Sequence, residues 1–115
     1  MYLPDLAMTL NDLGVLDGMQ NRGGDAREHY EEALQSYRQL AQKDPDTYQP
    51  YLAGALNNLA FLDGNEDRRD EARALYTESL SVYRRLFQDD PGRYAGDVAR
   101  VEASLEELDK KAASR

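Results

Sequence analysis

Residues 10–18, Leu-Asn-Asp-Leu-Gly-Val-Leu-Asp-Gly, return as Leu-Asn-Asn-Leu-Ala-Phe-Leu-Asp-Gly at residues 56–64, 46 positions further along the chain. Extending this offset outward pairs residues 2–47 with residues 48–93 without a gap. Of the 46 pairs, 22 are identical. Such self-similarity at a fixed period is the signature of a repeat protein, in which each repeat is one supersecondary unit.

A shorter third copy occupies residues 94–115. It keeps Leu105 and Leu108 at the positions held by Leu59 and Leu62 in the second copy. A chain of 115 residues suits a single domain, because two independent hydrophobic cores would each be too small. We therefore expect one domain over residues 1–115, made of two full repeats and half of a third.

The composition predicts an all-α protein. The chain has 16 Leu and 14 Ala, but only 4 Val, 3 Thr and no Ile. Leu and Ala favour helix, whereas β-branched residues are enriched in strands. A chain with this composition has little material for a sheet.

Each repeat is predicted to form two helices joined by a turn. The first helix is expected to begin near Pro4 or Pro50, since proline is tolerated in the first turn of a helix. The second is expected to end at the sequence Asp-Pro, because the residue before proline avoids the α conformation. Asn21 and Asp67 are predicted to cap the second helices. Apolar residues step by three and four along each helix. Those of the second helices include four tyrosines that we expect in the core: Tyr30, Tyr37, Tyr76 and Tyr83.

Charge and composition exclude several classes of function. With 14 Lys and Arg against 22 Asp and Glu, the formal net charge is −8, which opposes nucleic-acid binding. The chain has no Cys, so it has no disulfide, thiolate metal site or Cys nucleophile. The sequence shows no membrane-spanning run, and we expect no signal peptide and a cytoplasmic protein with no membrane partner.

The spacing of small and aromatic residues resembles the tetratricopeptide repeat family. Leu13-Gly14 followed by Ala26, Tyr30 and Ala33 has this spacing, and the second copy repeats it as Leu59-Ala60, Ala72, Tyr76 and Ser79. The closing proline comes late in both copies, because the second helix is about two turns longer. In this the chain is similar to the repeats of kinesin light chain and of bacterial signalling proteins. The resemblance implies a right-handed solenoid of helical hairpins, ending in a C-terminal capping helix.

The resemblance also implies a non-enzymatic interaction module, whose first helices line a concave groove for a partner peptide. An asparagine there can both donate and accept hydrogen bonds, so it can hold an extended backbone. By position, the groove residues are expected to be Met8, Asn11, Val15, Asn57, Asn58, Phe61 and Arg100. We expect Asn11 and Asn57 to face the same surface with Phe61 beside Asn57, although the asparagines could equally hold repeat spacing.

The kind of partner follows from charge and position. Only Asn58 and Arg100 match the family members that clamp a C-terminal carboxylate, whereas Asn11, Val15 and Ser104 do not. We therefore expect a protein or peptide partner of basic or mixed charge. The alternative is a structural role, in which the chain forms a homo-oligomer or packs within a larger array without a peptide ligand.

Catalytic and metal sites have little support in the sequence. His29 is the only histidine, and we interpret it as a partly exposed helical residue. Asp63, Asn65 and Asp67 alternate like the start of an EF-hand loop, but Arg68 stands where its glycine should be. We expect no enzyme activity and no cofactor.

Asp17 and Asp63 replace an aromatic residue that the family has near a helix contact. A buried carboxylate needs a partner. We expect equivalent Asp–Arg pairs within both repeats. The candidate arginines are Arg22 and Arg27 in the first, and Arg68 and Arg73 in the second.

The C-terminal segment carries an apolar seam at heptad-like spacing: Tyr94, Val98, Val101, Leu105, Leu108 and Ala112. We expect this seam to pack on the second helix of repeat two, as a terminal cap. The alternative is a coiled coil with another molecule, for which about two heptads are few.

Overall fold

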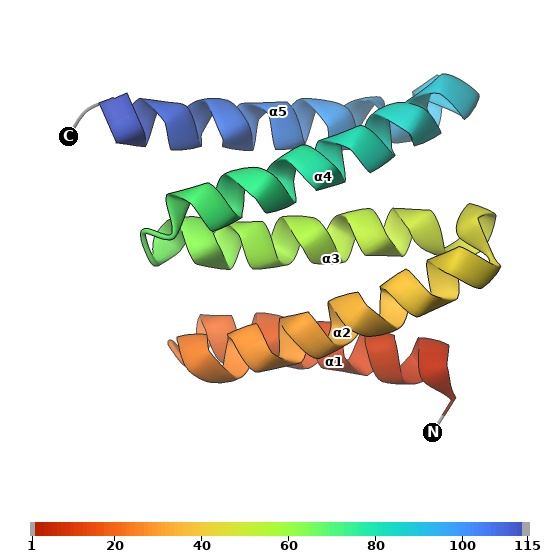
Figure 1. Cartoon of the computed structure of the whole chain (residues 1–115), viewed down its shortest axis with the longest axis horizontal. Coiled ribbons are helices and arrows are strands. Elements are labelled where there is room, and N and C mark those ends of the chain that lie inside the picture. The colour runs from red at the N-terminus through yellow and green to blue at the C-terminus, as the bar shows by residue number, and fades with distance from the viewer. Residues whose placement is uncertain (1, 114–115) are drawn as a thin grey trace.

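The computed structural model describes residues 2–113, and over this range the chain forms five helices and no strand. Their bounds are α1 (Leu3–Met19), α2 (Gly23–Lys43), α3 (Pro45–Asn65), α4 (Arg69–Asp89) and α5 (Pro91–Ala113). Each helix packs against the next, so the chain is a solenoid of antiparallel helical hairpins (Figure 1). The predicted all-α repeat architecture is confirmed. None of these helices is long and apolar enough to cross a membrane.

The junction between hairpins is a single residue. Asp44 ends α2 and also caps α3, where its side chain accepts a hydrogen bond from the Thr47 backbone N–H at 3.3 Å. Pro45 follows as the first residue of α3, which needs no backbone donor at that position. The predicted start near Pro50 is therefore wrong. Pro50 lies inside α3, which has already been initiated more than a turn earlier by Asp44 and Pro45.

The turn within each hairpin differs from the predicted cap. Asn21 and Asp67 have φ angles of 60° and 62°, a left-handed conformation that Asn and Asp tolerate. The N–H of the following arginine bonds back to the carbonyl of Asp17 or Asp63 at 2.8 Å. This is the hydrogen bond of a Schellman motif, which ends a helix. Asn21 and Asp67 thus terminate the first helices and do not cap the second ones.

The core forms where the helices meet, as two clusters of buried residues, and the partly buried Leu75 packs against both. The four tyrosines predicted in the core are buried, as expected. Small residues allow close packing: an ideal Cβ on Gly14 would lie 2.6 Å from the ring of Tyr30. In the second hairpin, the Ser79 hydroxyl donates to the backbone carbonyl of Ala53 at 2.9 Å. Both hairpins therefore rely on side chains too small to separate their helices.

The C-terminal helix packs as a cap. Tyr94, Val101 and Leu108 are buried in one cluster with residues of α4, including Tyr83. Tyr83 and Tyr94 have ring centroids 6.4 Å apart. The prediction that the seam packs on the second helix of repeat two is confirmed for the residues from Tyr94 to Leu108. The side chain of Ala112 lies outside the described residues.

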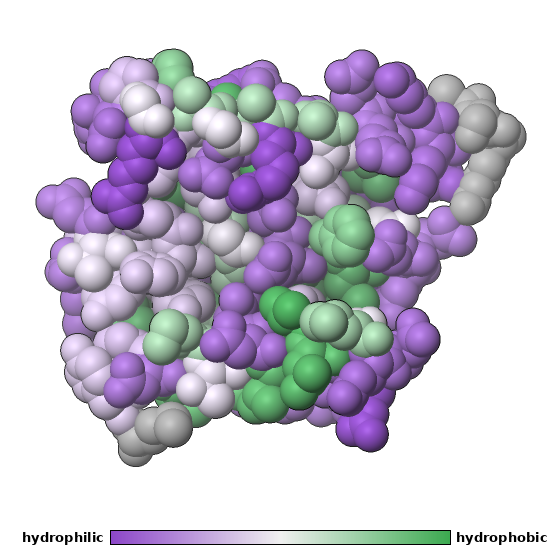
Figure 2. Space-filling model, turned by 180° about the vertical axis from the view of Figure 1, so that it is seen from behind, coloured by the Kyte–Doolittle hydropathy of each residue, from purple (hydrophilic) through white to green (hydrophobic). Residues whose placement is uncertain are grey.

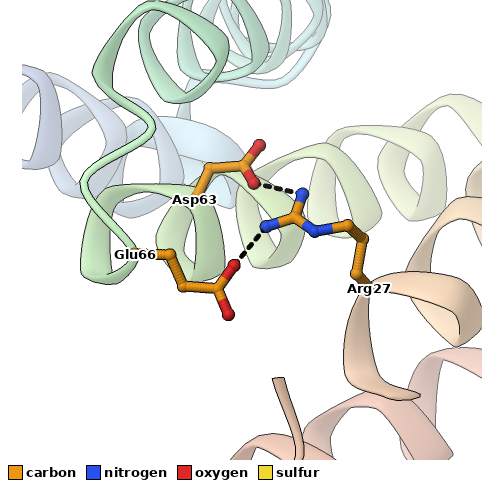
Figure 3. A network of polar contacts seen from close by, with 3 residues as sticks. All are labelled: Arg27, Asp63 and Glu66. Carbon is orange, nitrogen blue, oxygen red and sulfur yellow. Dashed lines mark hydrogen bonds and ion pairs between the residues drawn. The ribbon is translucent and has the colours of Figure 1, made fainter. Parts of the chain in front are cut away.

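Consecutive hairpins are joined by an arginine that reaches forward to the next hairpin. Arg27 of α2 pairs with Asp63 and Glu66 at the end of α3, with an Nη2–Oε1 distance of 2.5 Å to Glu66 (Figure 3). At equivalent positions 46 residues later, Arg73 of α4 pairs with Asp109 of α5. Burial disfavours the charged form of Arg27, but the two carboxylates outweigh this effect and raise its pKa. The expected Asp–Arg pairs within each repeat are wrong, because these arginines point to the following hairpin.

Asp17 is the first-repeat equivalent of Asp63 and Asp109, 46 and 92 residues earlier in the chain, but its partner is a histidine. Its Oδ2 lies 2.5 Å from Nδ1 of His29, and the Asp17 side chain is only 10% exposed. His29 is partly exposed, as predicted. Among residues 2–113 no hairpin precedes α1, so the arginine position that serves Asp63 and Asp109 is unoccupied for Asp17.

We predict that Gly14→Ala destabilises the protein by about 1–3 kcal/mol, because the new methyl group would force the Tyr30 ring aside. Gly18→Ala is the matched control on the same helix, where no heavy atom lies within 4 Å of the new Cβ. It should stabilise the protein by about 0.5–1 kcal/mol through helix propensity. Urea unfolding measures both, and equal effects would contradict the packing described.

We predict that Arg27→Met costs about 3–5 kcal/mol in the free energy of unfolding, because it leaves the buried Asp63 without its cation. Arg73→Met, at the equivalent position, should cost less than about 1 kcal/mol, since Arg73 and Asp109 are both exposed. The double variant Arg27→Met/Asp63→Leu should recover much of the loss. Similar costs for the two single variants would exclude a special role for burial at Asp63.

We predict that the protein loses stability at alkaline pH. Burial raises the pKa of each core tyrosine, Tyr30, Tyr37, Tyr76 and Tyr83. The native state therefore holds these phenol protons to higher pH than the unfolded chain does. This contribution is complete below about pH 10 and is lost as the pH rises through the raised values. The melting temperature should fall over this range, and less steeply in Tyr37→Phe/Tyr83→Phe; an unchanged slope would be inconsistent with this cause.

Candidate functional site

The first helices of the three successive repeats, α1, α3 and α5, contribute to one hollow on the surface. Its lining is Asn11, Tyr37, Pro50, Tyr51, Gly54, Ala55, Asn57, Asn58 and Arg100. The structure therefore brings together four of the residues that the sequence singled out, from three different helices. They meet because Asp44-Pro45 and Asp90-Pro91 return the chain so that the first helices follow one another along the solenoid.

The asparagines of this hollow have different surroundings. Asn58 Nδ2 donates to Asn11 Oδ1 at 3.2 Å, which links α3 to α1. Asn57 Oδ1 is buried and has no hydrogen-bond partner among the described residues. A buried acceptor without a donor is costly, and Asn57 is the asparagine of this hollow whose oxygen is left without one.

Tyr51 lies at the centre of a longer groove, and the sequence prediction missed it. It is 53% exposed and lines the asparagine hollow as well as two adjoining hollows. Its ring stacks on Tyr37, with centroids 5.8 Å apart and planes 13° apart. One signal was available: the equivalent positions carry Asp5 and Asp97, so Tyr51 is an aromatic residue that the repeat pattern does not require.

Mixed charge surrounds this groove. The hollow beyond Tyr51 toward α5 is lined by Asp46, Asp97 and Arg93, and the hollow toward α1 by Asp5. Arg100 pairs with Asp97 at 3.1 Å but its side chain remains half exposed. The guanidinium group of Arg93 lies 5.2 Å from the ring centroid of Tyr94. The groove thus offers both carboxylates and guanidinium groups around an aromatic centre.

The other three candidate residues lie outside the asparagine hollow. Met8 lines the adjoining hollow toward the N-terminus of α1, together with Tyr51. Phe61, 61% exposed, lines a separate hollow with Tyr76 and Leu108. Val15 is exposed on α1, and no described hollow includes it. Phe61 and Asn57 therefore line different hollows.

Within the described part of the chain, no group of three or more His, Asp or Glu side chains could hold a metal ion. The carboxylate of Asp63, which begins the EF-hand-like sequence, pairs with Arg27 instead. Asp67 forms the left-handed turn between α3 and α4. These residues have structural roles in the hairpin.

The model of the Tetratricopeptide repeat family matches residues 6–46 and 52–91. The two matched segments follow the two hairpins of the structure. The chain therefore belongs to the tetratricopeptide repeat family, whose members are generally non-catalytic and bind protein partners. Among curated proteins none matches this chain, and the narrower similarity to kinesin light chain is not confirmed.

Proposed function

We propose that this protein is a non-enzymatic interaction module that binds an extended peptide segment of a partner protein in the groove around Tyr51. The observation that carries the proposal is the convergence of Asn11, Asn57 and Arg100 on one hollow from three successive helices. Such a site requires the stacked repeats, since no single hairpin supplies all three side chains.

The chemistry of the groove suits a peptide backbone. The side chains of Asn11, Asn57 and Asn58 line the hollow, and Asn11 and Asn58 retain amide capacity beyond the bond between them. Tyr51 provides an aromatic surface already oriented by its stack on Tyr37. An aromatic side chain held in this way can anchor a partner residue at small entropic cost.

The surrounding charges favour a segment of basic or mixed charge. Asp5, Asp46 and Asp97 line the groove, against Arg93 and Arg100, and the chain as a whole carries −8. A strongly acidic peptide would meet repulsion during approach, whereas Lys or Arg side chains would be attracted.

Selection of a random peptide library against the immobilised chain tests the proposal. Peptides recovered with the wild-type protein should bind about tenfold or more weakly to Tyr51→Ala and Asn57→Ala, because each removes a central contact. Their affinity should fall as salt rises. Phe61→Ala, which removes an exposed aromatic residue from a separate hollow, is the matched control and should leave binding unchanged.

Two results would overturn the proposal. One is a selection that yields no binding peptide, and the other is a set of peptides whose affinity is the same for Tyr51→Ala as for wild type. Light scattering of the same samples addresses the structural alternative. A stable oligomer that buries the groove would favour a role in assembly without a peptide ligand.

A further inference from the structure

The outward face of α1 repeats a surface that is covered elsewhere in the solenoid. Leu13 and Leu59 are equivalent positions, and their exposed fractions are 38% and 5%. Leu16 and Leu108 are equivalent in the same register, with exposed fractions of 47% and 4%. The difference arises because α2 packs on α3, and α4 on α5, whereas no described helix lies against this side of α1. Figure 2 shows hydrophobic surface gathered at the bottom of the view, where α1 lies.

The 46-residue repeat also places a carboxylate, that of Asp17, beside this face. Asp17 corresponds to Asp63 and Asp109, and each of the latter two pairs with an arginine from the helix that covers its own helix. Arg27 and Arg73, which supply these guanidinium groups, are themselves equivalent positions. A helix placed on α1 as α2 is placed on α3 would bring an arginine alongside Asp17, whose Oδ2 pairs with His29.

We propose that the outward face of α1 docks an amphipathic helix of a partner protein that carries an arginine opposite Asp17. The apolar positions Leu13 and Leu16 would be covered by small and apolar residues of that helix, as α2 covers α3. This surface is distinct from the groove around Tyr51, so the proposal does not depend on the proposed function.

Charge favours such a partner over a second copy of this chain. The described α1 contains Asp5, Asp12 and Asp17 and no basic residue, so two α1 faces would bring like charges together. The opposite end of the solenoid is also unsuitable. In α5 the positions equivalent to Leu10 and Gly14 of α1 carry Glu102 and Glu106, which are exposed and acidic. A partner helix bearing an arginine is complementary to α1, whereas neither end of a second copy is.

The test uses a synthetic helix whose covering geometry the structure already contains. The probe has the sequence of α4, which carries Arg73, and is stapled between positions 77 and 81, both of which are exposed in α4. Stapling is needed because an isolated helix of this length is marginal in water. Binding of the fluorescent probe to the whole chain is followed by anisotropy, and its location by amide chemical-shift changes.

Matched variants separate this face from the rest of α1. Leu16→Glu should weaken probe binding about tenfold or more, and Asp17→Asn about three- to tenfold. Val15→Glu adds the same charge one residue away, at a position whose equivalents Phe61 and Glu107 stay exposed although their helices are covered. It should leave binding unchanged. On the probe, Arg73→Gln should weaken binding more than Arg84→Gln, since the register places Leu10 rather than a carboxylate opposite Arg84.

Every outcome is decisive. Saturable binding with shifts at Leu13 and Leu16, lost in Leu16→Glu and kept in Val15→Glu, supports the proposal. Absence of saturable binding, equal loss in the two variants, or shifts confined to Tyr51 and Asn57 would overturn it. So would a wild-type dimer that Leu16→Glu converts to a monomer, because a second copy would then be the occupant. The melting temperature of each variant, measured in parallel, identifies any loss that is due to unfolding.

Discussion

A carboxylate buried in the first helix of one hairpin and an arginine from the preceding hairpin constrain how the repeats of this chain stack. Asp63 is almost fully enclosed, so its charge requires Arg27, and Arg27 can reach it only when α2 lies along α3 in one register. The apolar cluster that joins α2 and α3 forms in the same register. The ion pair makes this register more specific, because apolar contacts alone would let α2 slide along α3 more readily than a paired charge does.

This stacking also determines what the groove contains. Because consecutive repeats stack along the solenoid, Asn11, Asn57 and Arg100 line the same hollow although 46 or 43 residues separate them in sequence. Pro50 and Tyr51 of α3 line hollows together with Tyr37 of α2 and with Arg93 of α5. The ring of Tyr51 stacks there on the ring of Tyr37. The constraint that holds the hairpins together is thus also the one that assembles the candidate site.

The outward faces of the first and last helices, α1 and α5, are chemically different. In α5 the positions that would face a further helix are Ala99, Glu102 and Glu106, which suit contact with water. In α1 the positions that face outward are Leu13 and Leu16, which in α3 and α5 are apolar and covered. The outward face of α5 therefore resembles a solvent-exposed surface, whereas that of α1 resembles the apolar side of a contact between two repeats.

The sequence by itself determined the repeat unit, the helical content and the core. Residues 10–18 and 56–64 set the period, and the spacing of the buried tyrosines set the face of each second helix, because both are local patterns of side chains along one helix. Only the tertiary structure decided the partners of Asp17 and Asp63 and the central position of Tyr51. Each of these depends on which atoms of a different segment approach within a few ångströms, and a periodic pattern gives the face of a helix but not the atoms that lie opposite it.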